Sequence, residues 1–426
     1  MIRPTRTWRL AAVLASATLV LSACGSDEPE TDAGDEPTTE ESPSEAAADC
    51  ESDGTLNVGS LLPQTGDLAF LGPPEFAGVD LAIQEINDAG GVLGQEVGSF
   101  KADSGDGTPD IAGASVDNLL NDSVDVIIGA AASGVSLSVI DKITGAGVVH
   151  FSPANTAAAF DTYEDQGLYF RTAPSDRLQG QVLGDMAVAD GHTNVAIMAR
   201  QDAYGEGLAE QTRTTLEEKG ATVSEFILYS ADAQNFTAEV NQVAAAKPDA
   251  IVLIAFNETT KIIPQFIAKG VGPQDVQIYF VDGNMSNDYK GFDLTGVKGT
   301  FPAPGEVDES FNERLLEVDP DLTDFTYGPQ SYDAVVMSAL AAIAADADCG
   351  EAIATEIVNV SKDGTQCASF EECAQLLSDG EDIDYEGASG PTDMNDTGSP
   401  NKATIGIQEY DGNKYTQIDS VSGVLD

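Results

Sequence analysis

The 426-residue chain carries 72 acidic and only 19 basic side chains, which gives a formal net charge of −53 at pH 7. This balance excludes nucleic acid as an expected partner, because phosphate binding needs clustered Lys and Arg. The acids are spread along the whole sequence and salt screens charges beyond ~10 Å, so we expect them to serve solubility, as suits a salty habitat.

The N-terminus has the pattern of an export signal. Three arginines precede an apolar stretch at 10–21, which is too short to span a bilayer. Small residues then lead into Cys24, and this junction resembles the lipobox of bacterial lipoproteins, in which the cysteine becomes the first mature residue and carries acyl chains. The resemblance implies a signal peptide at 1–23 and a stable membrane anchor at Cys24. The alternative is an ordinary secretory signal with a chance cysteine.

Residues 24–53 are predicted to be an acidic, disordered tether. Twelve acidic residues and no basic one lie between Gly25 and Asp53, and almost nothing there could form a core. A flexible chain of this length spans roughly 30 Å. No later stretch is apolar enough to cross a membrane, so we expect the folded part to be extracytoplasmic, anchored at the outer face of a bacterial cell membrane.

Four further cysteines, an even number, favour disulfides in an exported protein. Three pairings are possible. The short loop between Cys367 and Cys373 favours that pair, which leaves Cys50 to join Cys349. A metal site is not expected, because there is no Cys-x-x-Cys and no accompanying histidine.

Beyond the tether one unit recurs: a β-branched run, a Gly-rich or polar turn, and a helical pattern that ends at Gly. This pattern predicts strands at 56–62, 124–128, 148–151, 195–198, 250–255 and 278–281. It predicts helices that open at Pro73-Pro74-Glu75, pass through Val139 and Ile143, and span 205–219 and 261–269. Strands separated by helices imply an α/β fold with mostly parallel sheets.

The length and three breaks in this pattern predict two lobes. About 370 residues follow position 54, too many for one compact core. The pattern is interrupted near 171–176, 301–305 and 387–391. Three breaks suggest three crossings between two Rossmann-like lobes, with a ligand cleft where the carboxyl ends of the strands meet. The predicted segments are 54–172 with 303–388 for lobe 1, and 173–302 with 389–426 for lobe 2.

Several runs resemble the branched-chain amino-acid binding proteins of ABC transporters, from Leu56 to the C-terminus. The runs are Leu62-Pro63-Gln64-Thr65-Gly66, Glu75-Phe76-Ala77-Gly78, Ile86-Asn87-Asp88-Ala89-Gly90-Gly91, Phe151-Ser152-Pro153-Ala154-Asn155-Thr156, Tyr204-Gly205-Glu206-Gly207 and Tyr332-Asp333-Ala334. The resemblance implies the type I periplasmic-binding fold, in which two lobes close on a small ligand.

Two loops of lobe 1 carry groups for an anionic ligand. Ser133 lies where a strand gives way to a helix, so its hydroxyl and nearby N–H groups can bind an anion with help from the helix dipole. Thr156 and the Ala154 carbonyl follow the next strand. The resemblance implies that these groups hold the α-carboxylate and ammonium of an amino acid. The alternative is helix capping by Ser133 and Thr156.

Lobe 2 offers a carboxylate for the cationic end of the ligand. Asp282 follows the predicted strand at 278–281, and the family resemblance assigns an acidic residue there to a ligand ammonium. A simple turn aspartate before Gly is the alternative. Tyr204 would add a hydroxyl, and Phe70 and Tyr327 would supply apolar walls. Where leucine-binding members commonly show aromatic residues, this chain has Leu71, Phe256 and Asn257.

An enzyme finds little support. The chain has no Gly-x-Ser-x-Gly, no phosphate loop and no Gly-x-Gly-x-x-Gly after a strand. Of the two histidines, His150 lies in an apolar strand and His192 in a polar turn. A weak imitation of a calcium loop at 382–393 is better explained as a hinge crossing.

We therefore expect an extracytoplasmic solute-binding lipoprotein of an ABC importer that captures a small amino-acid-like ligand, without cofactor or catalysis. Its expected partners are the ligand, the membrane and ABC permease subunits. The alternatives are a ligand-sensing receptor component without transport, and an amide-, urea- or carboxylate-binding member of the same fold.

Overall fold

The computed structural model describes residues 50, 52–106, 109–302 and 309–424, all within one compact unit that spans Glu45–Asp426. The predicted signal peptide, the lipidation site at Cys24 and nearly all of the tether lie outside the described residues, as do 303–308 at the second predicted break. Within the described residues, no helix has both the length and the apolar character that a membrane span requires.

The first sheet has five parallel strands in the order β2-β1-β3-β4-β5. Its strands are β1 (Asn57–Leu62), β2 (Gly98–Asp103), β3 (Val126–Gly129), β4 (Val149–Ser152) and β5 (Tyr169–Arg171). The helices that connect them are α1 (Gly72–Asp88), α2 (Pro109–Asn121) and α3 (Ser133–Thr144), with a short 3₁₀ turn η2 (Ala158–Thr162) after β4. Each strand runs into a helix on one side or the other, as a β-branched run followed by a helical pattern requires.

The second sheet has seven strands in the order β15-β14-β10-β9-β8-β6-β7. Five are parallel: β6 (Asn194–Gln201), β7 (Thr222–Ser230), β8 (Ala250–Ile254), β9 (Gln277–Val281) and β10 (Lys298–Pro302). The last two, β14 (Lys402–Asp411) and β15 (Lys414–Val424), run antiparallel. The helices of this region are α4 (Asp176–Ala189), α5 (Ala203–Glu218), α6 (Thr237–Ala246) and α7 (Thr259–Lys269), and the 3₁₀ turn η3 (Asp282–Asn284) follows β9.

A third, small sheet, β11-β12-β13, lies in the later part of the chain. Its strands are β11 (Thr365–Cys367), β12 (Ile383–Gly387) and β13 (Gly390–Pro391), and the helices nearby in sequence are α8 (Glu309–Val318), α9 (Gly328–Ala345), α10 (Gly350–Ile357) and α11 (Phe370–Ser378). Cys50 is joined to Cys349, and Cys367 to Cys373.

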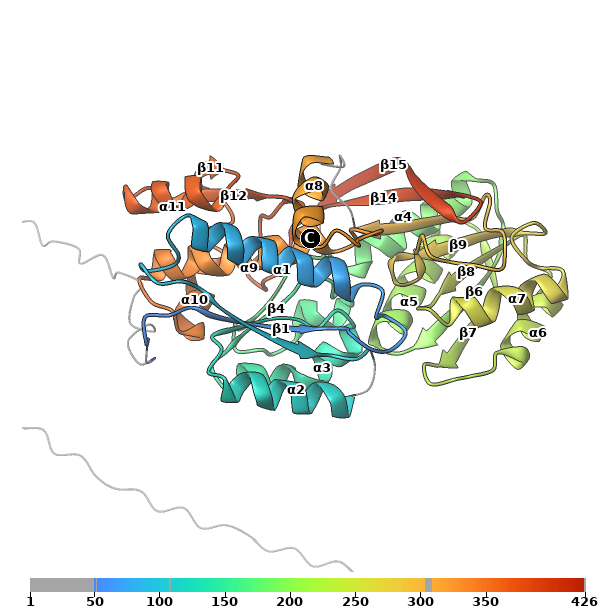
Figure 1. Cartoon of the computed structure of the whole chain (residues 1–426). Helices are drawn as coiled ribbons and strands as arrows, with labels where there is room; N and C mark the ends of the chain where they lie inside the picture. Colours follow the sequence, from blue (N-terminus) through green and yellow to red (C-terminus); the bar gives the residue numbers. More distant parts are fainter. Residues whose placement is uncertain (1–49, 51, 107–108, 303–308, 425–426) are drawn as a thin grey trace, which may run out of the picture. The chain divides into compact units, whose positions relative to one another are not determined.

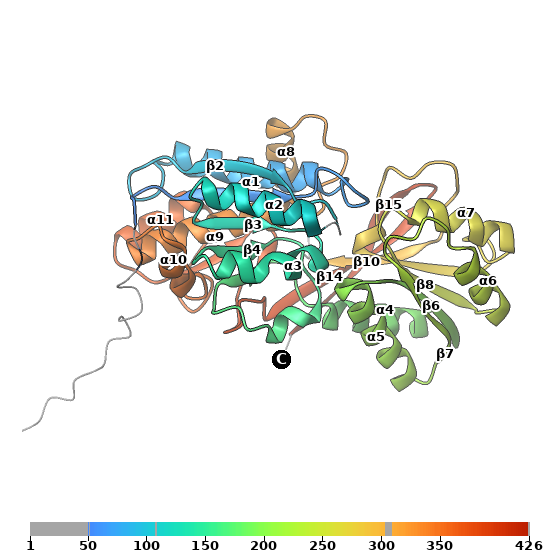
Figure 2. The ribbon, with the colours of Figure 1, turned by 90° about the horizontal axis from the view of Figure 1, so that it is seen from below.

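Helices cover both faces of each large sheet. Figure 1 shows α1 and α9 on one side of the first sheet and α2 and α3 on the other. In Figure 2 the strands of the second sheet lie between α4 and α5 on one side and α6 and α7 on the other. A Cβ on Gly78 of α1 would come within 2.2 Å of the Gly328 carbonyl oxygen, so glycine allows α1 to pack directly against the start of α9.

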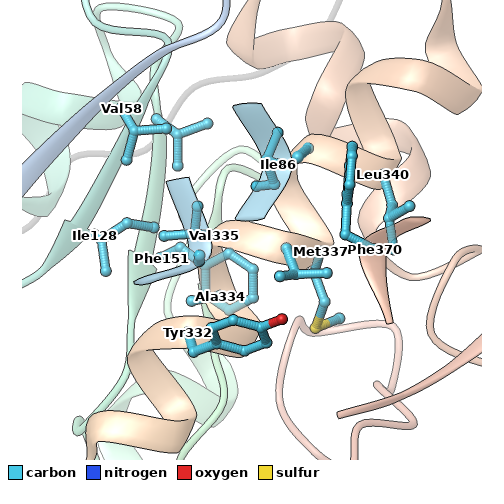
Figure 3. Packing of buried hydrophobic residues seen from close by; sticks show 14 of the residues in the cluster. Val58, Ile86, Ile128, Phe151, Tyr332, Ala334, Val335, Met337, Leu340 and Phe370 are labelled. Atoms are coloured by element: carbon cyan, nitrogen blue, oxygen red, sulfur yellow. The ribbon is translucent and has the colours of Figure 1, made fainter. Parts of the chain in front are cut away.

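The core of the first sheet forms because β-branched side chains alternate across its strands. Val58 of β1 and Ile128 of β3 belong to one buried cluster with Ile86 of α1 and Leu340 of α9 (Figure 3). The residues that alternate with these along each strand, such as Ile127 next to Ile128, point to the opposite face of the sheet and join a second buried cluster. A sheet buried on both faces gives nearly continuous apolar strands, which is the pattern that the sequence shows.

The predicted α/β class is confirmed. Every predicted strand and helix is present, with boundaries displaced by up to three residues. The sequence pattern gave no prediction for α2, α4, α6, α8 to α11, β2, β5, β7 or β10 to β15. In β2, β7 and the 402–424 hairpin, polar residues interrupt the apolar runs. The lobe boundaries remain a prediction. The first predicted break lies between the end of β5 at Arg171 and the start of α4 at Asp176. At the third predicted break β13 still pairs with β12 of the small sheet, so the chain returns to the second sheet only at Lys402.

Candidate functional site

A small cavity lies at the carboxyl ends of strands from both large sheets. Its volume is about 20 Å³, and it is lined by Leu68, Leu71, Ala131, Ala132, Ser133, Ala154, Tyr204, Phe256, Asp282, Gly283 and Tyr327. Open α/β sheets place ligands at this end of their strands. Five predicted site residues therefore share one cavity: Ser133, Ala154, Tyr204, Asp282 and Tyr327.

Two predicted residues are not among those that line the cavity. Thr156 is buried in the loop after β4, and Phe70 is half-buried and packs against the same hydrophobic cluster as Leu71. Tyr327 was predicted to be an apolar wall only, but its hydroxyl also takes part in the polar network of the site.

Asp282 is the centre of that network. It follows β9 in η3, it is 5% exposed, and three side chains donate to its carboxylate. The Gln179 amide and the Tyr204 hydroxyl both donate to Oδ1 at 2.8 Å, and the Tyr327 hydroxyl donates to Oδ2 at 2.9 Å. Burial raises the pKa of Asp282 above its ordinary value, and the three hydrogen bonds oppose that shift.

Ser133 and Thr156 do not cap helices. The N-cap of α3 is Ala132, and the N-cap of η2 is Ala157, neither with a side-chain hydrogen bond to the helix. The Ser133 hydroxyl instead accepts a hydrogen bond from the Ala157 N–H at 3.3 Å, while the Thr156 hydroxyl lies beside the Asp176 carboxylate. The helix-capping alternative is therefore wrong for both, and each hydroxyl can still bind a ligand.

A buried arginine holds the loop that carries Thr156. Arg171 donates through one terminal nitrogen, Nη1, to the carbonyls of Asn155 at 3.2 Å and Ala157 at 3.0 Å, and its other terminal nitrogen pairs with Asp161. Because the two carbonyls flank Thr156 on both sides, Arg171 fixes the position of the Thr156 backbone.

The start of α4 adds two polar residues that the sequence did not single out. Gln179 donates to Asp282, and Asp176, one turn earlier, is fully buried beside the Thr156 hydroxyl. Burial, and then the nearby charge of Asp282, raise the pKa of Asp176 well above its ordinary value. An acid in the first turn of a helix is typical of dipole stabilisation, so its spacing gave no signal of a site.

The aromatic wall of the cavity is held by a buried cation. The Arg200 guanidinium lies 3.4 Å from the centre of the Phe256 ring, whose other neighbour is the Tyr204 ring at 5.6 Å. Arg200 also pairs with Glu258 at 2.9 Å and with Asp202 at 2.5 Å. Both acids and the cation–π contact fix the guanidinium, and the guanidinium in turn fixes Phe256.

The cavity combines one carboxylate, two tyrosine hydroxyls and one serine hydroxyl with apolar walls. Among the described residues that line it there is no His, Cys or Lys, and His150 and His192 lie elsewhere in the structure. His150 is fully buried, and burial lowers its pKa to about 4, as suits a core residue. The arrangement can bind a small ligand that has a positively charged group.

Comparison with known proteins gives the family. A family described as "Periplasmic binding protein" matches residues 55–408. The chain is 29% identical over 307 residues to Leu/Ile/Val-binding protein homolog 1 of Brucella abortus (strain 2308), which covers 70% of this chain and 80% of that protein. It is 31% identical over 195 residues to the leucine-, isoleucine-, valine-, threonine-, and alanine-binding protein of Pseudomonas aeruginosa, with 45% and 51% covered.

Solved structures show the same fold. A branched-chain amino acid transporter substrate binding protein of Streptococcus pneumoniae, in complex with isoleucine, matches with a TM-score of 0.71 at 20% identity over 87% of this chain and 100% of that one. A solute binding protein of an ABC transporter from Rhodopseudomonas palustris BisB5, in complex with 3,4-dihydroxy benzoic acid, matches with a TM-score of 0.71 at 19% identity, with 88% and 99% covered. The resemblance drawn from the sequence motifs is thereby confirmed.

Proposed function

The chain belongs to the periplasmic binding protein family, and from this premise we propose that it captures a small amino-acid-like solute for an ABC importer. Relatives named for binding leucine, isoleucine and valine support an amino acid, whereas some structural neighbours hold aromatic acids. The observation that supports an amino acid is the buried carboxylate of Asp282 at the cavity wall. A carboxylate enclosed with an anionic aromatic acid would be repelled, while an ammonium compensates it.

The proposed binding mode uses both sides of the cavity. The hydroxyl of Ser133 and the N–H groups at the start of α3 bind the carboxylate of the ligand, assisted by Thr156 and by the Ala154 carbonyl for its ammonium. Asp282 and Tyr204 bind the ammonium from the second sheet, and Phe70 and Tyr327 contribute to the apolar surroundings. Contacts from both sides favour the closed form, which the permease subunits recognise, and the ligand is released unchanged.

The proposal includes a place for the protein. Lipidation at Cys24 anchors it to the outer face of the cell membrane, and the acidic segment that follows lets the binding unit reach a permease. Replacement of Cys24 by Ser should move the protein from the membrane fraction to the soluble fraction and abolish labelling by radioactive palmitate. Persistent membrane association of Cys24→Ser would contradict the anchor without touching the binding function.

Calorimetry on the full chain tests the binding function. The ligands are leucine, isoleucine, valine, threonine, alanine, benzoate and 4-hydroxybenzoate. We expect at least one amino acid to bind, and Ser133→Ala or Asp282→Ala to weaken it by ~1.5–3 kcal/mol, the usual value of a charge-assisted hydrogen bond. Ser138→Ala is the matched control, because its hydroxyl bonds only the Val135 carbonyl of its own helix. Binding of the aromatic acids alone, or unchanged affinity in both variants, would refute the assignment.

A further inference from the structure

The cavity beside Asp282 is small for a ligand site. Its volume is about 20 Å³, whereas a single water molecule needs about 10–15 Å³. Pockets that hold larger organic ligands usually measure ~300–1,000 Å³. Even the smallest amino acid must therefore widen this cavity on binding, and each further carbon atom of the ligand widens it more.

The apolar wall on the side of the second sheet is a phenylalanine ring with fixed neighbours. Phe256, in the turn after β8, is 3% exposed. The centre of its ring lies 3.4 Å from Cζ of Arg200 and 5.6 Å from the centre of the Tyr204 ring. The ring also touches Gly283, where a Cβ atom would come within 2.8 Å of ring carbon Cδ1. Because protein interiors are close-packed, a ring with these neighbours keeps its place when a ligand presses on it.

The apolar wall on the side of the first sheet is fixed as well. Leu68 and Leu71 are both buried in the turn before α1, where the Leu71 N–H donates to the Leu68 carbonyl at 2.9 Å. At the next residue, Gly72, a Cβ atom would come within 2.0 Å of the Pro63 carbonyl oxygen. The backbone of this turn is therefore already in contact with the residues that follow β1, so it has no room to move away from the cavity.

A ligand that is too large for the cavity would separate these walls and break a contact that joins them. The Tyr327 hydroxyl donates to Oδ2 of Asp282 at 2.9 Å. Tyr327 precedes α9, which lies beside the first sheet (Figure 1), whereas Asp282 follows β9 of the second sheet. Both side chains are buried, so separation leaves polar groups without partners and penalises the large ligand.

We propose that the site selects the amino acids with the smallest side chains, glycine and alanine, and that Phe256 is the residue that excludes larger ones. The inference rests on the proposed function and narrows its ligand class. The polar groups of the cavity bind the ammonium and carboxylate that all amino acids share, so they do not distinguish side chains. The apolar walls distinguish them by volume, because a carbon atom added to a filled apolar space forces its neighbours apart. Leucine and the other branched amino acids are disfavoured.

A series of ligands that grows by one carbon atom at a time tests this on the full chain. Calorimetry measures the affinity for glycine, alanine, 2-aminobutyrate, norvaline and leucine. We expect glycine or alanine to bind most tightly, and the affinity to fall by about fivefold or more with each carbon atom beyond alanine, as the usual cost of overpacking implies. Norvaline or leucine binding as tightly as alanine, or more tightly, overturns the proposal and requires no variant.

Replacement of Phe256 tests its part in the selection. Phe256→Ala removes the ring and should raise the affinity for leucine relative to alanine by about tenfold or more. Phe256→Leu, which keeps a smaller apolar wall, should change this ratio in the same direction by less. Phe292→Ala is the matched control and should leave the ratio unchanged, because this half-buried ring packs beside Tyr289 in a separate apolar cluster.

The ratio separates selection from a structural role. A merely structural Phe256 would lower the affinity for every amino acid alike, so an unchanged ratio of leucine to alanine affinity in both Phe256 variants overturns the assignment. If the unmodified protein binds no amino acid at all, the proposed function itself fails.

Discussion

Replacement of the buried Arg171 by Met should destabilise the protein substantially. The Arg171 side chain is 0% exposed and gives hydrogen bonds to the Ser399 hydroxyl at 2.9 Å and to two carbonyls of the loop after β4, besides its pair with Asp161. Loss of a buried, hydrogen-bonded charge usually costs ~3–5 kcal/mol. Here the buried Asn155 and Ala157 carbonyls lose their donor, while Asp161 keeps Arg177 and Ser175. At an unfolding entropy of ~2.1 cal/mol/K per residue, about 370 residues give ~0.8 kcal/mol/K, and the midpoint Tm should fall by ~4–6 °C.

The chain supplies its own control for this variant. Arg177 binds the same carboxylate group, through Oδ2 of Asp161 at 3.1 Å, but its side chain is 51% exposed. An exposed pair contributes ~0–1 kcal/mol, so Arg177→Met should lower Tm by ~1 °C or less. Differential scanning calorimetry measures both shifts. Equal shifts in the two variants would refute the reasoning that burial decides the strength of the pair. Arg171→Met should also weaken ligand binding, because the loop around Thr156 loses its anchor.

Three further outcomes are expected. Burial raises the pKa of Asp176, so its contribution to stability is present below the ordinary aspartate pKa of ~3.9 and is lost as the pH rises through the folded pKa. In urea unfolding without ligand, the free energy of unfolding of Asp176→Asn should therefore rise relative to that of the unmodified protein between pH 4 and 7. A difference that stays constant with pH would contradict this. Arg200→Met should weaken ligand binding ~2- to 30-fold through loss of the cation–π contact that fixes Phe256, measured by calorimetry, and unchanged affinity would exclude that role. Reduction of both disulfides should lower Tm by roughly 10 °C, since cross-links between residues 299 and 6 positions apart restrict the unfolded chain by about 8 kcal/mol in total, whereas a shift under ~2 °C would contradict that estimate.

The sequence predicts the fold where one physical requirement dominates. Strands such as β8 are buried on both faces, so their apolar runs stand out from the turns on either side. The strand β7 is an edge strand with partly exposed residues, and its mixed composition hides it from a search for apolar runs. In the antiparallel strand β15 partly buried and exposed residues alternate, and its polar residues likewise leave no continuous apolar run to identify.

The site was predicted only in part, for a different reason. Asp282 and Ser133 could be identified because a residue that follows a strand in an α/β fold lies at the ligand end of the sheet. Asp176 and Gln179 lie at the start of a helix, where an acid and a glutamine are ordinary residues. Their burial and contacts arise only when segments more than a hundred positions apart come together, as in the Gln179 to Asp282 hydrogen bond.

The two aspartates should differ in what their replacement does to the free protein. In the absence of ligand, Asp282 accepts three hydrogen bonds, so a ligand cation must partly replace contacts that already exist. Asp176 is fully buried, and burial and the charge of Asp282 outweigh the Thr156 hydroxyl beside it in raising its pKa. Asp176→Asn should therefore raise the Tm of the ligand-free protein at neutral pH, whereas Asp282→Asn should lower both Tm and ligand affinity. Asparagine takes up no proton on folding and so avoids the cost that burial imposes on Asp176 at neutral pH, and a fall in the Tm of Asp176→Asn would contradict this reasoning.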